Sequence, residues 1–234
     1  MTVPEIMSEL QAMGSESIKK ILLKHGVKEP FFGVKIEHLK TIQKRVKTDY
    51  QLALDLYATG NADAMYLAGL VAADEKMTKT DLQTWVEQAL SKNISEYTVP
   101  WVAAGSRYGY ELALEWINSP VEHIAAAGWS TLSNLVALKP DEELDLLALK
   151  GLLARVVKTF HQAGNQVRSV MNGFIIAVGT YVGPLTADAM AAAAELGAVT
   201  IDTNGTACKV PDAAAYIVKS QSKGPVKKKK VVKC

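Results

Sequence analysis

The sequence predicts an all-α protein built from stacked helical repeats. Apolar residues recur at helical spacing, as in Lys35–Lys47, where Ile36, Leu39 and Ile42 lie on one face and lysines lie on the other. Short turns with Gly, Pro or Ser separate segments of helical length throughout the chain. A third observation is the lack of strand patterns, since even Ala198–Asp202 is short enough to be a loop.

The expected helices begin and end at recognisable residues. Ser15 is a candidate N-cap and Gly26 a stop signal, while Thr78 precedes a helix with Asp81 in its first turn, where a carboxylate suits the helix dipole. Pro100 is tolerated in a first turn. The expected helices span Pro4–Met13, Ser15–His25, Lys35–Lys47, Tyr50–Ala58, Ala62–Ala73, Thr78–Ser91, Val99–Ser106, Tyr108–Ile117, Val121–Leu138, Glu142–His161, Gln166–Val182, Thr186–Leu196 and Asp212–Lys219.

These helices form pairs of about 35–40 residues, the period of HEAT-like units. Such pairs stack into a curved α-solenoid with an extended concave binding surface, although a compact helical bundle has the same periodicity. We therefore expect a helical-repeat domain over residues 1–196, a connector with a short helix over 197–218, and a disordered lysine-rich tail over 219–234.

The charge of the chain is unevenly distributed. Lys219–Lys233 carries +7 while the whole chain carries +2, so residues 1–218 carry −5. Ile18–Lys47 carries another +7, with nine Lys or Arg against two Glu. Two cationic zones of this kind favour a polyanion such as nucleic acid as partner. The alternative for the tail is a solvated segment that only aids solubility.

Other features of the sequence exclude several classes of protein. No apolar run reaches the length of a membrane span, and the N-terminus has no signal-peptide pattern. Cys208 and Cys234 indicate no disulfide framework, so we expect a cytoplasmic protein, nucleoid-associated in a bacterium if it binds DNA. The four histidines are scattered, so neither a metal nor a cofactor is expected.

Three segments resemble the AlkD-like DNA alkylation repair proteins. They are Phe31–Val46, with a Phe-Gly-Val turn before a basic helix, Leu52–Ala68, and Trp116–Ser119 followed by Glu122. The resemblance covers roughly Ile18–Val182. It implies a HEAT-like solenoid that cradles duplex DNA on its concave face and recognises cationic N3- and N7-alkylated purines, with excision in active members.

The family's catalytic pattern is not matched in this sequence. Where active members have a Trp-Asp…Asp cluster, Ser95–Trp101 contains only Glu96 as an acid. Their Arg-Arg-Ala helix corresponds to Ala125–Ala127, and their late Trp helix to Arg168–Phe174, which has no Trp. We therefore expect a divergent branch of the family.

Glu96 is the candidate catalytic residue, because a carboxylate stabilises the oxocarbenium-like sugar as a cationic base leaves. Its alternative is an exposed acid in a first helical turn. Tyr97, Trp101 and Trp129 are candidates for stacking on the base or deoxyribose, although aromatic residues at helical spacing more often belong to the core. The candidate phosphate ligands are Lys40, Lys44, Lys47, Arg107, Arg168, Lys227, Lys228, Lys229 and Lys230.

Two hypotheses therefore remain from the sequence. The first is a repair protein that recognises, and in the active case excises, alkylated bases as a DNA N-glycosylase. The second is a non-catalytic helical-repeat scaffold that binds nucleic acid or a protein partner. The missing carboxylate cluster favours the second, and the basic zones make DNA the expected ligand in both.

Overall fold

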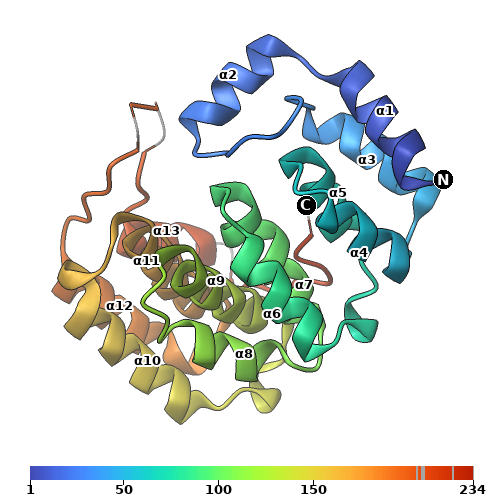
Figure 1. The fold of residues 1–234 in the computed structure, drawn as a ribbon. Coiled ribbons are helices and arrows are strands. Elements are labelled where there is room, and N and C mark those ends of the chain that lie inside the picture. The colour runs from blue at the N-terminus through green and yellow to red at the C-terminus, as the bar shows by residue number, and fades with distance from the viewer. Residues whose placement is uncertain (204, 207–208, 223, 234) are drawn as a thin grey trace. The chain divides into compact units, whose positions relative to one another are not determined.

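The computed structural model describes residues 1–203, 205–206, 209–222 and 224–233, and all regular structure in these ranges is helical (Figure 1). Cys208 and Cys234 lie outside them. The α-helices are α1 (Val3–Met13), α2 (Glu16–Lys24), α3 (Ile36–Val46), α4 (Tyr50–Ala58), α5 (Ala62–Val71), α6 (Lys79–Gln88), α7 (Val99–Gly105), α8 (Gly109–Trp116), α9 (Glu122–Leu138), α10 (Leu146–Thr159), α11 (Asn165–Tyr181), α12 (Thr186–Leu196) and α13 (Ala213–Gln221). Short helical turns are η1 (Asp74–Lys76), η2 (Ile94–Thr98), η3 (Asp141–Glu143), η4 (Phe160–Gln162) and η5 (Gly183–Leu185).

Most helix ends lie close to the predicted ones, but one helix begins later than predicted and one predicted N-cap makes no capping hydrogen bond. The helix expected over Glu142–His161 begins only at Leu146, because η3 follows Pro140 and the Asp145 side chain accepts a hydrogen bond from Ala148 N at 2.9 Å. Ser15 occupies the N-cap position of α2, but its side chain makes no capping bond and contacts Ser17 instead.

The expected cap of α6 is confirmed. Thr78 Oγ1 accepts a hydrogen bond from Asp81 N at 3.1 Å, and the Asp81 carboxylate accepts one from Thr78 N at 2.9 Å. This reciprocal capping box satisfies two N–H groups that the helix itself leaves unpaired. Gly26, with φ of +81°, follows the end of α2 as predicted.

The chain divides into two compact units, formed mainly by Met1–Leu112 and by Ala113–Val232. In the first unit, α5 packs against α3, α4 and α7, and α6 packs against α7. Every residue of α5 is buried, so this helix forms the centre of the unit. Helix α4 contributes Tyr57 to the core, where its ring stacks on Trp85 of α6 with 4.0 Å between the ring centroids.

In the second unit, α11 packs against α9 on one side and α13 on the other, so these three helices lie side by side (Figure 1). Helices α10 and α12 pack against each other as a second row. Small residues allow the close approach: a Cβ at Gly179 of α11 would lie 2.4 Å from the Ile217 side chain of α13. The core between the rows contains Trp129, Leu153, Phe160 and Phe174 among other apolar residues.

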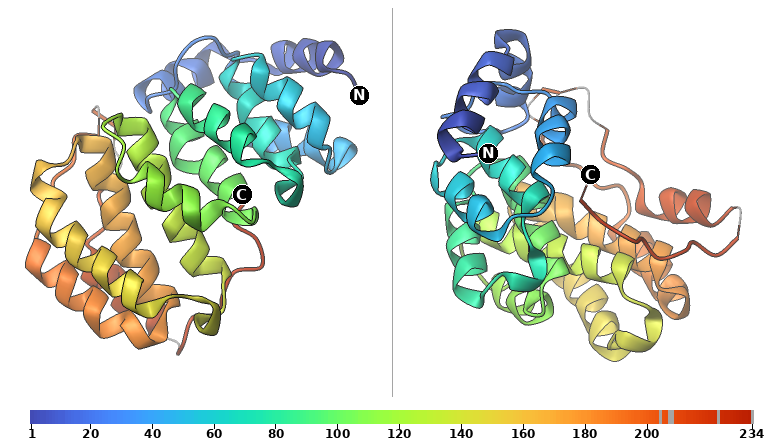
Figure 2. Two further views of the ribbon diagram at one scale, coloured as in Figure 1. Left: turned by 60° about the horizontal axis from the view of Figure 1, so that its bottom comes forward. Right: turned by 90° about the vertical axis from the view of Figure 1, so that its right-hand side faces the viewer.

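The C-terminal part of the chain contains contacts to the helical body within the range 219–234, where the sequence predicts a tail. Helix α13 extends to Gln221, two residues beyond the predicted end, and the following residues run on without helix or strand (Figure 2). Lys228 and Lys233 form ion pairs with carboxylates of the helical body. These two ion pairs connect the helical body to a segment whose composition is typical of disorder.

In the part of the chain that the structure describes, no single helix is long and apolar enough to cross a membrane; only the bent pair Asn165–Tyr181 and Gly183–Leu196 reaches that length together. Nor do the described residues contain a group of three His, Cys, Asp or Glu side chains that could hold a metal ion.

Candidate nucleic-acid interface

Helix α3 carries two of the predicted phosphate ligands of the first unit, Lys40 and Lys44. Lys40 is half-buried and Lys44 exposed, and within the described residues neither makes an ion pair. Lys47 departs from the predicted stripe, because the helix ends at Val46 and Lys47 adopts a positive φ of 64° at its C-cap. Two lysines on one helical face and a third at its end therefore present unpaired positive charge.

The loop before α3 is held by Asp63, which the sequence analysis missed. The Asp63 carboxylate accepts backbone hydrogen bonds from Phe32 N at 2.7 Å, Gly33 N at 3.0 Å and Val34 N at 3.3 Å. Burial raises the pKa of Asp63, and these three hydrogen bonds work against the rise. Gly33 is required here, since its φ is +80° and a Cβ would lie 2.6 Å from Ser15 O.

The candidate residues Glu96, Tyr97 and Trp101 lie together in the first unit. Helical turn η2 continues into α7 without a break, so Tyr97 and Trp101 share a face as predicted, with ring centroids 6.0 Å apart. The Trp101 ring packs edge-on against Tyr66 of α5 at 5.4 Å. Trp101 is 5% exposed and Tyr97 51% exposed, so only the tyrosine offers an open ring.

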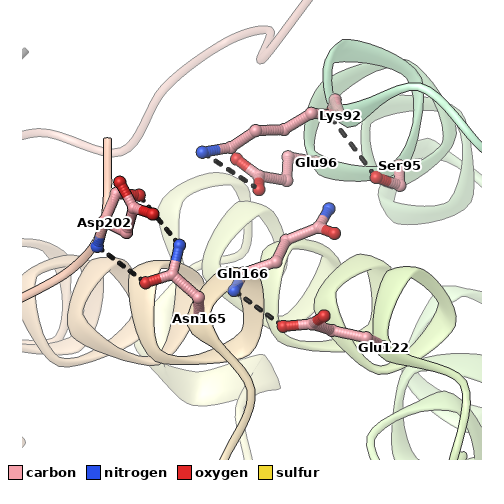
Figure 3. A network of polar contacts seen from close by, with 7 residues as sticks. All are labelled: Lys92, Ser95, Glu96, Glu122, Asn165, Gln166 and Asp202. Atoms are coloured by element: carbon pink, nitrogen blue, oxygen red, sulfur yellow. Dashed lines mark hydrogen bonds and ion pairs between the residues drawn. The ribbon is translucent and has the colours of Figure 1, made fainter. Parts of the chain in front are cut away.

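Glu96 is not the exposed helix-end acid that formed its alternative interpretation. The residue is 8% exposed, and its carboxylate Oε1 lies 3.8 Å from Lys92 Nζ, as Figure 3 shows. The i, i+4 spacing places the lysine over the carboxylate. A negative charge held beside a lysine is partly neutralised before any substrate arrives.

Trp129 belongs to the core of the second unit. It is fully buried, with its ring 5.2 Å from Phe174 and 5.8 Å below the Arg155 guanidinium. Its indole Nε1 has no hydrogen-bond partner among the described residues. In this position Trp129 has no free face for stacking on a base.

An open pocket of about 380 Å³ lies beside Trp129 and is also lined by Arg155 and Glu122. The Arg155 guanidinium donates to Ile117 O at 2.7 Å and caps the chain after α8. Glu122 accepts a hydrogen bond from Gln166 N at 2.8 Å at the start of α11 (Figure 3). Both charged side chains therefore hold helix ends together.

The two isolated arginines differ in their surroundings. Arg107 is exposed, lies over the Tyr108 ring at 4.7 Å and donates to the Tyr108 hydroxyl. Arg168 of α11 is half-buried, and its Nε has no hydrogen-bond partner among the described residues. Nearby, Asn165 exchanges two hydrogen bonds of 2.8 Å with the Asp202 backbone and fixes the connector to α11 (Figure 3).

The C-terminal lysines fall into two groups. Lys227, Lys229 and Lys230 are exposed. Lys228 is half-buried and pairs with Asp141 at 2.7 Å, so it is less available to a phosphate than the sequence suggested. This pairing connects residues far apart in the chain, and no local sequence signal predicts it.

Known proteins resemble this chain over its whole length. A sequence model of the family described as "DNA alkylation repair enzyme" matches residues 6–195. The chain belongs to this family. The uncharacterized proteins Lin0241 of Listeria innocua and Lmo0209 of Listeria monocytogenes are each 32% identical to it over 228 residues, which cover 95% of this chain and 98% of theirs.

A solved structure supports the HEAT-like fold of this member of the DNA alkylation repair family. It matches with a TM-score of 0.91 and 33% sequence identity and covers 100% of both chains. It is described as a new family of proteins related to the HEAT-like repeat DNA glycosylases, with affinity for branched DNA structures. The prediction of an all-helical, HEAT-like repeat protein is therefore confirmed.

Proposed function

We propose that this protein binds DNA through the phosphate backbone, prefers branched DNA structures, and excises no base. The observation that carries this proposal is the full-length structural match to a protein whose family has affinity for branched DNA. A junction brings the phosphates of several arms close together, so a protein that reads backbone and shape can select it without contacting base edges.

The charge distribution supports a backbone-binding role. The unpaired Lys40 and Lys44 on α3 and the exposed Lys227, Lys229 and Lys230 offer cations without a competing carboxylate. Lysine contacts to phosphate release condensed counterions and supply affinity that is independent of sequence. The acidic remainder of the chain limits DNA contact to these zones.

The candidate catalytic residues do not favour base excision. Trp101 and Trp129 are buried, and Glu96 is buried beside Lys92. The departures from the family's Asp, Arg and Trp pattern that the sequence analysis infers point the same way. A glycosylase needs a carboxylate and aromatic faces that meet the extruded nucleotide.

The second candidate is recognition and excision of cationic N3- or N7-alkylated purines. It is favoured by the family match and by the exposed Tyr97 ring adjacent to Glu96. In that case Glu96 stabilises the developing charge on the sugar, and Tyr97 contacts the cationic base.

Two measurements on one protein preparation separate these functions. Fluorescence anisotropy compares a four-way junction with a duplex of the same sequences, and a base-release assay uses methylated duplex DNA. We expect tighter binding to the junction and no release of N3- or N7-methylpurine. Equal affinity for the two DNAs would contradict the proposed preference, and no binding to either would favour a protein partner.

Release by the wild-type protein would contradict the non-catalytic function. The variant Glu96→Gln would then test the role of the carboxylate, since it keeps size and hydrogen bonding but removes the charge. A loss of roughly 10²–10³ in rate is expected for a well-placed stabilising group, and an unchanged rate would exclude Glu96.

A further inference from the structure

The C-terminal arm, residues 224–233, is anchored in the first unit by Lys233. Its ammonium Nζ lies 3.0 Å from Ala72 O and 2.6 Å from Asp74 Oδ1. Ala72 is the C-cap of α5, and Asp74 is the first residue of η1. A carbonyl from the end of a helix and the carboxylate of the next helical turn thus bind one lysine. We call this site, formed by Ala72 O and Asp74, the α5 socket.

The same arrangement occurs in the second unit with Lys228. Its Nζ lies 2.9 Å from Val136 O and 2.7 Å from Asp141 Oδ1. Val136 is in the last turn of α9, and Asp141 is the first residue of η3, so this α9 socket has the same parts as the first. The C-terminal end of a helix attracts a cation through unpaired carbonyls and the helix dipole.

The residues next to the α9 socket fix the main chain of the arm as well. Lys229 N donates to Ala137 O at 2.7 Å, and Lys229 Nζ lies 5.6 Å from the centre of the Tyr181 ring. The backbone at Lys229 is therefore held in place while its side chain stays exposed. Lys227 and Lys230, on either side, are also exposed.

We infer that the two sockets hold the C-terminal arm as an ordered cationic ridge that presents Lys227, Lys229 and Lys230 to DNA phosphates. Lys228 and Lys233 are anchors, and they contact no phosphate themselves. This inference rests on the proposed function and assigns a second DNA-contacting surface besides α3. An ordered ridge binds more tightly than a free tail, because the entropy of ordering the lysines has been lost on folding.

The chemistry of the sockets argues against an autoinhibitory arm. An inhibitory arm would cover the cationic groups that bind phosphate, but this arm covers carboxylates. Asp74 is followed by Glu75, and Asp141 by Glu142 and Glu143, so both sockets lie in acidic turns that repel DNA. When the arm docks, Lys233 and Lys228 lie beside these negative charges, and the local electrostatic potential becomes more favourable for phosphate.

The test compares two double variants that change the net charge by the same amount. Asp74→Asn with Asp141→Asn removes both anchoring carboxylates, and Glu75→Gln with Glu142→Gln removes exposed neighbouring ones. General electrostatics predicts that each pair strengthens DNA binding equally. We expect the anchor pair to bind the four-way junction about tenfold more weakly than the control pair, because the free arm must be ordered on binding.

Limited trypsin digestion reports docking without DNA, since cleavage after Lys228 and Lys230 requires the arm to leave the body. We expect slow cleavage in the wild type and the control pair and fast cleavage in the anchor pair. Equal affinities for the two pairs would overturn the ridge, and tighter binding by the anchor pair would indicate autoinhibition instead. Wild-type protein that binds no DNA, with its arm still protected, would overturn the proposed function and the ridge while leaving the docking intact.

Discussion

The two basic zones of this protein carry the same charge of +7, yet the structure treats them differently. In Ile18–Lys47, Lys19, Lys35 and Arg45 pair with carboxylates of the N-terminal helices and loops, while Lys40 and Lys44 make no ion pair within the described residues. In Lys219–Lys233, Lys228 and Lys233 are bound by carboxylates from distant parts of the chain. The unpaired lysines of the first zone stand on α3, whereas the second zone, in its described residues, has no helix beyond Gln221 and reaches the helical body through the ion pairs of Lys228 and Lys233.

This difference shows that a count of lysines overstates the charge available to a ligand. Within the described residues Lys40 and Lys44 stay unpaired while Arg45 on the same helix pairs with Glu9, because a helix satisfies its own backbone hydrogen bonds and does not need every side chain to find a charge partner. A segment without regular structure has to obtain its order from contacts with the body, and lysine side chains supply them here. As a result, Lys228 and Lys233 are paired with carboxylates of the protein and are not available to a ligand.

The largest effect on stability is expected from removing the Asp63 carboxylate, which holds the loop before α3 in the first basic zone. Asp63→Ala leaves three N–H groups of the loop before α3, two buried and one half-buried, without their acceptor. Each unsatisfied donor costs on the order of 1–3 kcal/mol, so we expect a loss of several kcal/mol in the free energy of unfolding. Urea denaturation measures this loss.

The matched control for that experiment is Asp55→Ala, which removes an exposed carboxylate that, among the described residues, accepts a hydrogen bond only from Gln51 on the same helix. It should change the stability by no more than about 0.5 kcal/mol. Similar losses in the two variants would show that the loop is not held by Asp63.

A second prediction concerns the unpaired lysines of α3. The double variant Lys40→Ala with Lys44→Ala should weaken DNA binding and lower the slope of log K against log salt by about 0.9 for each phosphate that the variant can no longer bind. Binding isotherms at several salt concentrations measure both quantities. The control is Lys150→Ala with Lys158→Ala on α10, where Lys150 already pairs with Asp188. An equal effect in the control would show that the α3 lysines contribute only through the net charge of the protein.

The smallest effect is expected at the α5 socket and depends on pH. Burial raises the pKa of Asp74 to about 6, with Lys233 opposing the rise and Glu75 adding to it. Below about pH 6 the Asp74 carboxyl takes up a proton and its ion pair with Lys233 is broken, so the end of the arm should become mobile.

Global stability should respond to this titration in the opposite direction. The pKa of Asp74 is higher in the folded than in the unfolded state, so the folded state binds more protons in this range. The free energy of unfolding therefore increases through Asp74 as the pH falls from about 6 toward the ordinary pKa of 3.8. Backbone ¹⁵N relaxation of residues 229–233 between pH 7.5 and 5 measures the mobility. The same change in Asp74→Asn, which has no carboxyl to titrate, would contradict the assignment.

The sequence by itself determined the helices. Helical periodicity is a local property, and caps such as Thr78 with Asp81, or stops such as Gly26, act within a few residues of the helix end. The repeat period was also visible, because each helix pair has to bury its apolar face against the next pair. Leu146 shows the limit of this reasoning, since charged residues of the Asp141–Glu143 turn resemble a first helical turn.

Only the tertiary structure decided which candidate site residues are accessible. Glu96 and Trp129 have the composition of a site, but neighbouring elements bury them, and no local pattern reveals a neighbour that is distant in sequence. Asp63 was missed for the same reason, since its three donors lie about thirty residues away in the chain. The division of the C-terminal lysines into anchors and exposed cations likewise depends on carboxylates at Asp74 and Asp141, which only folding brings to them.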